Sequence, residues 1–210
     1  MERPVLNGIV IEGTDFVGKT TLANNLLGCL ARFGLNAFHR KCFLSKEPII
    51  QFLSAPSEGR SLEESDWMLT AAYLLDDINP RELDNFAIQE RNWISQVARN
   101  RFFHGEKFVE YSRRIEQRHY QFSTQIYLHS CIDAKRARAA SRPPKGTRNA
   151  LLSSDPVLHQ EFDEFSMSIL PKNEQWLIVD TSSLSPVDVC NIVLKAAGEL
   201  GSLTEANSSN

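Results

Sequence analysis

The feature that most constrains the fold is an eight-residue pattern near the N-terminus. Residues 13–20 read GTDFVGKT, which fits the phosphate-binding pattern G-x-x-x-x-G-K-[ST]. The glycines let the backbone turn so that its N–H groups point at phosphate oxygens. Lys19 would place a positive charge on the β- and γ-phosphates, and the Thr20 hydroxyl could ligate Mg²⁺. The pattern follows a β-rich run at 5–12 and opens a helix at about 19–33, so we expect a phosphate-binding loop here.

Strand-like and helical stretches alternate along the rest of the chain. We expect strands at about 36–44, 86–89, 125–129 and 176–180, and helices at about 62–79, at 156–170 and from Ser185 onward. Such alternation predicts a parallel sheet with helices on both faces, that is, an α/β three-layer domain. We expect one domain over residues 1–200, a disordered tail over 201–210, and a helix at 156–170 that packs in the core and to which we assign no chemistry.

Composition excludes several classes of protein. The 210 residues, 42% hydrophobic and 23% charged, suit one globular core rather than a disordered chain or a coiled coil. The net charge of -3 argues against a nucleic-acid polymer as partner. No signal peptide or bilayer-spanning run is visible, so we expect no membrane association and a cytoplasmic protein. The four scattered cysteines and five histidines argue against a disulfide framework or a zinc site.

Later segments decide between the functions that a phosphate-binding loop allows. No N-K-x-D guanine signature is present, and ATPase motors are normally longer, which favours a small-molecule kinase. The segment VIEGTDFVGKTT resembles the EGxDxxGK[ST]T loop of the thymidylate kinase family. The segment ERNWISQVARN at 90–100 is similar to that family's D-R-Y-x-x-S-x-x-A-Y-Q, with Arg91, Ser95 and Ala98 matching in place.

Two further segments extend the resemblance over most of the chain. Tyr127-Leu128, followed by Arg138 and Arg142, resembles the family's strand and arginine-bearing lid, which we expect at about 135–155. WLIVDT at 176–181 resembles its last strand. The stretch 99–148 holds 12 Lys and Arg against 4 Asp and Glu, which suits an anionic ligand. The resemblance therefore implies a three-layer P-loop kinase with a mobile lid.

The resemblance also implies a role for each candidate site residue. The residues expected to bind ATP are Gly13, Thr14, Asp15, Phe16, Val17, Gly18, Lys19, Thr20 and Thr21. Thr20 and Glu90 are expected to hold Mg²⁺. The candidate catalytic residues are Lys19, Asp15, Glu47, Arg91 (on the acceptor phosphate) and the arginines that would neutralise transition-state charge, Arg138, Arg142 and Arg148. The candidate substrate contacts are Trp67, Tyr73, Asp77, Ser95, Arg99 and Asn100.

The sequence departs from the family at positions expected to contact the base of the acceptor nucleotide. Asp77 stands where thymidylate kinases carry an arginine, and a carboxylate accepts hydrogen bonds but cannot donate them. Arg99-Asn100 replaces Tyr-Gln, and His129 replaces Asp. We therefore expect an ATP-dependent kinase of pyrimidine nucleoside monophosphates that is not strictly specific for dTMP. Phe16 stands where one branch of the family has an arginine, which gives the charge-neutralising role to the lid arginines.

Two alternatives remain open from the sequence. Lys46-Glu47-Pro48 resembles R-E-P of thymidylate kinases and equally the E-P motif of deoxynucleoside kinases. In the second case the protein is a nucleoside or other small-molecule kinase, and Glu47 takes a proton from a hydroxyl. The other alternative is a nucleotide-binding regulator that has lost turnover. The resemblance further suggests a homodimer.

Overall fold

The computed structural model describes residues 4–43, 48–54, 59–76, 86–141, 155–172 and 174–199. Its strands are β1 (Val5–Glu12), β2 (Ala37–Lys41), β3 (Phe86–Glu90), β4 (Gln121–His129) and β5 (Trp176–Asp180). Its helices are α1 (Lys19–Arg32), α2 (Pro48–Ser54), α3 (Leu62–Asp76), α4 (Trp93–His104), the 3-10 helix η1 (Gly105–Phe108), α5 (Val109–Arg118), α6 (Ile132–Ala140), α8 (Pro156–Ser168) and α9 (Pro186–Glu199).

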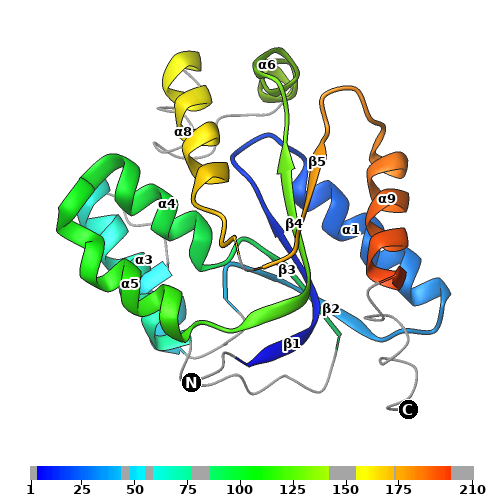
Figure 1. Ribbon diagram of the computed structural model, residues 1–210, viewed down its shortest axis with the longest axis horizontal. Helices are drawn as coiled ribbons and strands as arrows, with labels where there is room; N and C mark the ends of the chain where they lie inside the picture. The colour runs from blue at the N-terminus through cyan, green and yellow to red at the C-terminus, as the bar shows by residue number, and fades with distance from the viewer. Residues whose placement is uncertain are drawn as a thin grey trace.

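The strands form one parallel sheet in the order β2-β3-β1-β4-β5. β1 lies at the centre and pairs with β3 on one side and β4 on the other. Parallel neighbours require crossover connections, and helices supply them between successive strands. Because all strands run the same way, their carboxyl ends meet at one edge, where α6 and α8 also lie (Figure 1).

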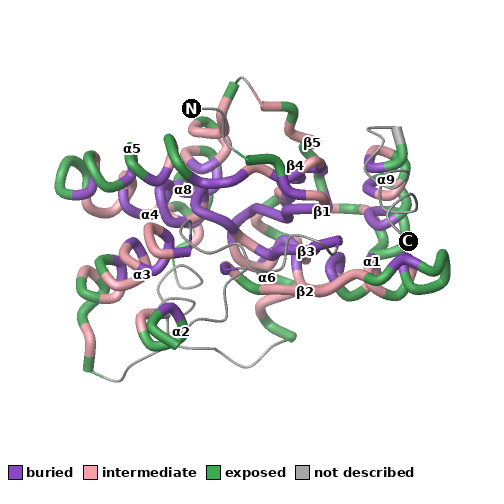
Figure 2. The backbone as a smooth tube through the Cα atoms, turned by 90° about the horizontal axis from the view of Figure 1, so that it is seen from below, coloured by how far each residue is buried: buried purple, intermediate pink, exposed green. Residues whose placement is uncertain are grey.

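Helices cover both faces of the sheet, as the alternation predicts. α1 and α9 pack together on one face, and α3, α4 and α5 cover the other (Figure 1). The central strands are buried along most of their length (Figure 2). Ile9, Ile11 and Ile88 pack against Leu26 of α1 on the first face. A second cluster on the other face includes Trp93, Ile94 and Val97 of α4. The expected α/β three-layer fold is confirmed.

Some element bounds differ from those predicted. β2 ends at Lys41 rather than near residue 44, because Cys42 adopts φ 65°, which a strand cannot accommodate. β4 begins at Gln121, four residues earlier than expected, since buried polar residues such as Thr124 mask its start in the sequence. The predicted end of the long helix near residue 79 lies outside the described residues, as do the lid over 142–154 and the tail. None of the described helices is long and apolar enough to cross a membrane.

Candidate active site

The loop between β1 and α1 turns at residues with positive φ. Gly13 has φ 132° and Gly18 has φ 103°, so the two glycines of the pattern occupy conformations that side chains disfavour. A Cβ at Gly13 would also lie 2.2 Å from the carbonyl oxygen of Leu128 on β4. Phe16 takes φ 65° at the apex. The loop thus has the sharp turn that its sequence predicts, against the carboxyl end of β4.

Lys19 is folded into the loop. Its Nζ donates to the carbonyl oxygens of Gly13 (2.8 Å) and Thr14 (2.5 Å), and its side chain is buried. Burial, and then the charge of Arg91, lower the Lys19 pKa to about 7. The ammonium is therefore poorly compensated in this state, and phosphate oxygens would satisfy it better than two neutral carbonyls do.

Thr20 and Glu90, the two residues expected to hold Mg²⁺, contact each other. Thr20 is the second residue of α1 and Glu90 the last of β3, and the Thr20 hydroxyl donates to Glu90 Oε2 over 2.6 Å. The other carboxylate oxygen lies 2.8 Å from His39 Nε2. The described residues contain no cluster of three or more His, Cys, Asp or Glu side chains suited to a metal. Mg²⁺ bound with phosphates needs only one or two protein oxygens, so the Thr20–Glu90 pair fits this ion.

Glu12, the last residue of β1, anchors the start of α4. Its carboxylate accepts hydrogen bonds from the Asn92 N–H (2.7 Å), the Ser95 N–H (3.3 Å) and the Ser95 hydroxyl (2.5 Å). Asn92 in turn caps α4 by accepting from the Ile94 N–H at 2.9 Å. Burial has the larger effect on the pKa of Glu12 and raises it, although these hydrogen bonds lower it. This network fixes the segment that carries Arg91.

Arg91 faces the loop from the carboxyl end of β3. Its guanidinium pairs with Asp15 and donates to the Ser95 hydroxyl at 3.3 Å. Burial opposes ionisation of Asp15, but Arg91 and Lys19 together hold the Asp15 pKa below its usual value. A small cavity beside this pair is lined by Glu12, Gly13, Thr14, Arg91, Ile94, Ser95, Ala98, Tyr127, Phe162 and Ser166. The structure thus brings Asp15, Arg91 and Ser95 together.

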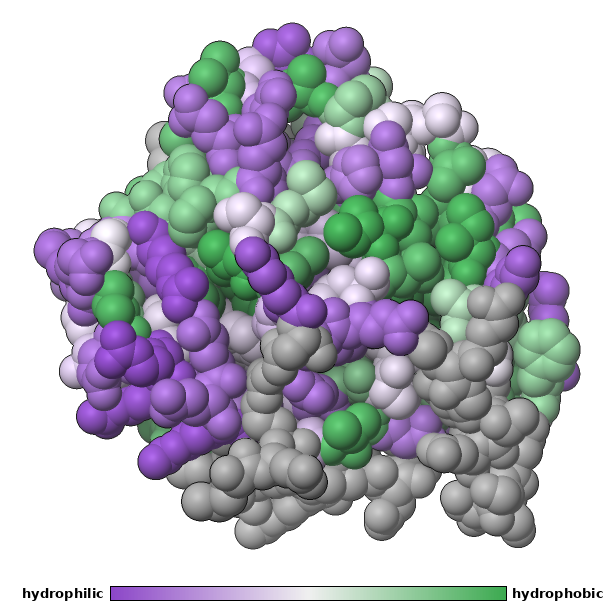
Figure 3. Space-filling view, viewed as in Figure 1, coloured by the Kyte–Doolittle hydropathy of each residue, from purple (hydrophilic) through white to green (hydrophobic). Residues whose placement is uncertain are grey.

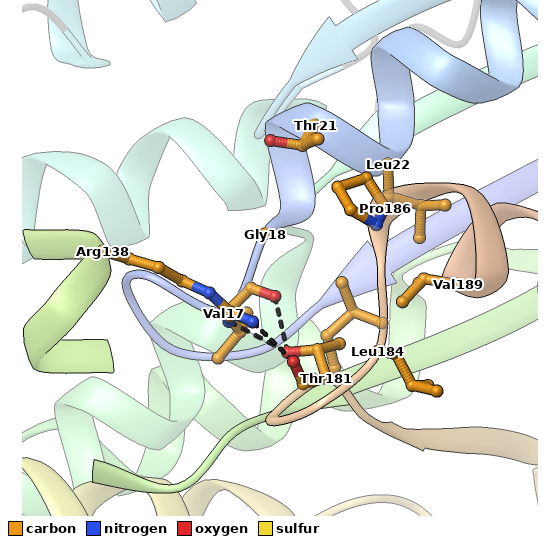
Figure 4. Close-up of a pocket in the computed structure, with 10 residues that line it drawn as sticks. Val17, Gly18, Thr21, Leu22, Arg138, Thr181, Leu184, Pro186 and Val189 are labelled. Atoms are coloured by element: carbon orange, nitrogen blue, oxygen red, sulfur yellow. Dashed lines mark hydrogen bonds between the residues drawn. The ribbon is translucent and has the colours of Figure 1, made fainter. Parts of the chain in front are cut away.

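A larger pocket of about 350 Å³ opens on the other side of the loop (Figure 4). Its walls come from the loop and α1, from β4, from Arg138 on α6, and from the connection between β5 and α9 with the start of α9. They include Gly18, Thr21, Leu128, Thr181, Leu184 and Val189. Arg138 donates to the carbonyl oxygens of Phe16 (3.1 Å) and Thr181 (2.5 Å), which fixes its guanidinium at the mouth of the pocket. The mostly apolar walls suit a nucleobase whose phosphates enter the loop.

A buried polar cluster joins the loop to α6 and α8. One carboxylate oxygen of Asp163 accepts from the hydroxyls of Thr14 (2.9 Å) and Tyr127 (3.1 Å). The other accepts from Lys135 Nζ at 2.5 Å. The apolar side chains of the helix at 156–170 pack in the core as expected, but sequence reasoning missed the polar contacts of Asp163. Its apolar spacing predicts the core face, but partners up to 149 residues away decide what its polar residues do.

Two aromatic candidates lie in apolar clusters. Tyr73 is buried against Phe43, with ring centroids 4.5 Å apart. Trp67, half exposed on α3, packs on Phe108 at 4.2 Å and on Tyr111 at 5.0 Å. Stacking of either ring on a substrate base stays a prediction.

Arg99 and Asn100 contact α3 rather than the loop. Arg99 Nε donates to Asp66 at 2.7 Å, and the fully buried Asn100 donates to the Thr70 hydroxyl at 2.9 Å. These side chains hold α4 on α3, a role that their place in the motif does not reveal. The candidates Glu47, Asp77, Arg142 and Arg148 lie outside the described residues, and their roles stay predictions.

Comparison with known proteins agrees with the fold. The sequence matches no protein-family model and no curated protein. Among solved structures, the chain is similar to the thymidylate kinase of Candida albicans, described as having broad substrate specificity, with a TM-score of 0.69. The two sequences are 16% identical, and the match covers 95% of this chain and 93% of the other. This similarity shows that the chain has an α/β fold like that of thymidylate kinase.

Proposed function

We propose that the protein is an ATP- and Mg²⁺-dependent kinase that phosphorylates a pyrimidine nucleoside monophosphate. One observation carries the proposal: the loop separates a pocket suited to a nucleobase from a guanidinium suited to a phosphate. Arg138 and Val189 line the first side, and Arg91 with Ser95 the second. Lys19 begins the helix between them. A donor and an acceptor would therefore meet at the loop with their phosphates facing each other.

The side chains then act by position and charge. Phosphoryl transfer needs little covalent help from the protein, but it needs in-line alignment and neutralisation of charge. Lys19 would leave the two carbonyls for the donor phosphates, and Arg91 would hold the acceptor phosphate. Thr20 and Glu90 would hold Mg²⁺, which supplies charge neutralisation on the donor phosphates when bound.

The acceptor is expected to differ from strict dTMP. Asp77 replaces an arginine in the resemblance, and a carboxylate suits an exocyclic amine such as that of cytosine. The similar Candida albicans enzyme has broad specificity by its description, which supports a tolerant acceptor site in this fold.

The test is ADP release from ATP–Mg²⁺ with a panel of nucleosides and nucleoside monophosphates. Turnover with a pyrimidine monophosphate, abolished in Lys19→Ala, is the expected result. Preference for CMP or dCMP, reduced by Asp77→Arg, would support the role given to Asp77. Turnover with nucleosides alone, lost in Glu47→Gln, would replace the proposal by the nucleoside kinase alternative. ATP binding without transfer to any acceptor would favour the other alternative, a nucleotide-binding regulator that has lost turnover.

A further inference from the structure

Two ammonium groups contact the same residue of the phosphate-binding loop. Lys19 Nζ donates to the Thr14 carbonyl oxygen at 2.5 Å, and Lys135 Nζ lies 3.2 Å from the Thr14 hydroxyl. Both side chains are buried. Within the loop sequence at 13–21, Lys19 is the only cationic residue. Lys135 therefore brings a second cation to the loop from α6.

The position of Lys135 is strongly determined. Its side chain is 4% exposed, and Asp163 on α8 accepts its hydrogen bond at 2.5 Å. The same carboxylate already accepts from Thr14 and Tyr127. A buried cation needs a counter-charge, and Asp163 supplies it in this state. The contact also places the ammonium against the loop rather than in solvent.

A neighbouring side chain indicates that this region is completed by a ligand. His159 is 2% exposed, and within the described part of the chain neither of its ring nitrogens has a hydrogen-bond partner. It lines a small cavity with Phe16, Lys135 and Arg136. Buried polar groups without partners are rare in folded proteins. A group rich in acceptor oxygens, entering beside Phe16, would accept a hydrogen bond from the ring N–H of His159.

We propose that Lys135 is a catalytic residue that binds the terminal phosphoryl group of the nucleoside triphosphate, with His159 donating to an oxygen of the same group. This proposal rests on the proposed function, because it deepens the role of the same loop. Transfer spreads charge over three equatorial oxygens, more than Lys19 alone can contact. Lys135 would move from Asp163 to these oxygens, a short step because both lysines already contact Thr14. Asp163 would keep its bonds from Thr14 and Tyr127.

The first experiment measures binding, which does not depend on turnover. Dissociation constants for ADP and for the ATP analogue with a β,γ-imido bridge are compared by calorimetry. The wild type is expected to prefer the triphosphate, and Lys135→Gln to lose about tenfold to a hundredfold of triphosphate affinity at unchanged ADP affinity. The matched control is Lys107→Gln, which removes a surface ion pair with Glu63. An unchanged preference in Lys135→Gln would overturn the proposal.

A second variant separates contact with phosphate from neutralisation of Asp163. Lys135→Gln/Asp163→Asn removes both charges, so a purely structural role of Lys135 predicts that triphosphate preference returns. We expect the double variant to lose the preference for the triphosphate, as Lys135→Gln does, and Asp163→Asn alone to keep it. Recovery of this preference in the double variant would overturn the proposal. Wild-type preference that depends on Lys135, without transfer to any acceptor, would refute the kinase proposal and the catalytic role of Lys135, and would leave its binding of the terminal phosphoryl group standing. Absence of triphosphate binding would refute both.

Discussion

Burial lowers the pKa of both Lys19 and Arg91, yet the net pKa shifts of the two side chains are opposite. Burial disfavours the charged form of each. Lys19 contacts two neutral carbonyls, and its pKa falls to about 7. Arg91 contacts the carboxylate of Asp15, and its pKa rises despite burial. Arg91 is thus charged at any ordinary pH, whereas Lys19 changes its charge near neutral pH.

This difference predicts that ATP binding takes up a proton. At pH 8 the pKa of about 7 leaves Lys19 mostly neutral, and phosphates raise that pKa by favouring the ammonium. Calorimetry at pH 8 in buffers of different ionisation enthalpy is expected to show net proton uptake, shrinking toward pH 6, where Lys19 is already protonated. Lys19→Met should remove the uptake. Identical apparent enthalpies in all buffers at pH 8 would contradict the lowered pKa.

The lowered pKa of Lys19 also makes the stability of the ligand-free protein depend on pH. The folded pKa of Lys19 lies below its unfolded value, so between about pH 7 and pH 10 the unfolded chain binds more protons. The contribution of Lys19 to stability therefore improves as the pH rises through this window. Lys19→Met should be more stable than the wild type at pH 6 in chemical denaturation.

Glu90 is predicted to set the Mg²⁺ requirement. Glu90→Gln keeps the shape but removes the charge beside the Thr20 hydroxyl. We expect the Mg²⁺ concentration for half-maximal turnover to rise about tenfold or more, with metal-free ATP affinity little changed. Glu116→Gln, which breaks a surface pair with Arg101, serves as the control. An unaltered Mg²⁺ dependence would remove Glu90 from the metal site.

At the scale of elements, the central pairing of β1 with β3 depends on a close backbone approach. Gly8 pairs with Ala87, and a Cβ at Gly8 would lie 2.2 Å from the Ala87 carbonyl oxygen. Such a distance requires the strands to separate. The same pairing places Glu12 and Glu90 at the sheet edge where the loop begins, so its register also positions the site.

Gly8→Ala is therefore expected to be strongly destabilising, by about 2 kcal/mol or more, as for other forced overpacking. Gly28→Ala is the matched control, because Gly28 lies exposed within α1 with nothing near its would-be Cβ. Removing a glycine from a helix interior should stabilise the protein by roughly 1 kcal/mol. The melting temperatures of both variants test this expectation. Equal changes of the same sign would contradict the close approach of Gly8 to Ala87.

At the scale of the whole molecule, the larger pocket beside the loop exists only because three distant segments meet. Thr21 comes from α1, Arg138 from α6, and Leu184 from the connection between β5 and α9. Apolar side chains also gather on the surface over β5 and α9 (Figure 3). Ile178 of β5 and Ile192 of α9 are both exposed. The expected homodimer stays a prediction, and measurement of the mass in solution tests it.

A side chain that fills the pocket should weaken the binding of the donor nucleotide and leave the fold intact. Leu184→Trp places a large ring into the space for the base, and we expect ATP affinity to fall at least tenfold, or about 1.4 kcal/mol. Val187→Trp, at an exposed position three residues on, is the control. Because a bound ligand stabilises the native state, the rise in melting temperature with ATP reports the affinity. Equal rises in both variants would place the donor base elsewhere.

The resemblance to thymidylate kinases singles out Glu90, Arg91 and Ser95, and only the structure shows their contacts. The sequence by itself determines the phosphate-binding loop and the parallel three-layer fold. These follow from local spacing, because glycine positions, caps and apolar periods fix the backbone, and strand ends in a parallel sheet share one edge. Only the tertiary structure decides that Lys135 and Asp163 meet Thr14, and that Arg99 and Asn100 bind α3. Periodicity shows which face of a helix is buried, but a polar side chain's partner depends on packing between segments distant in the chain.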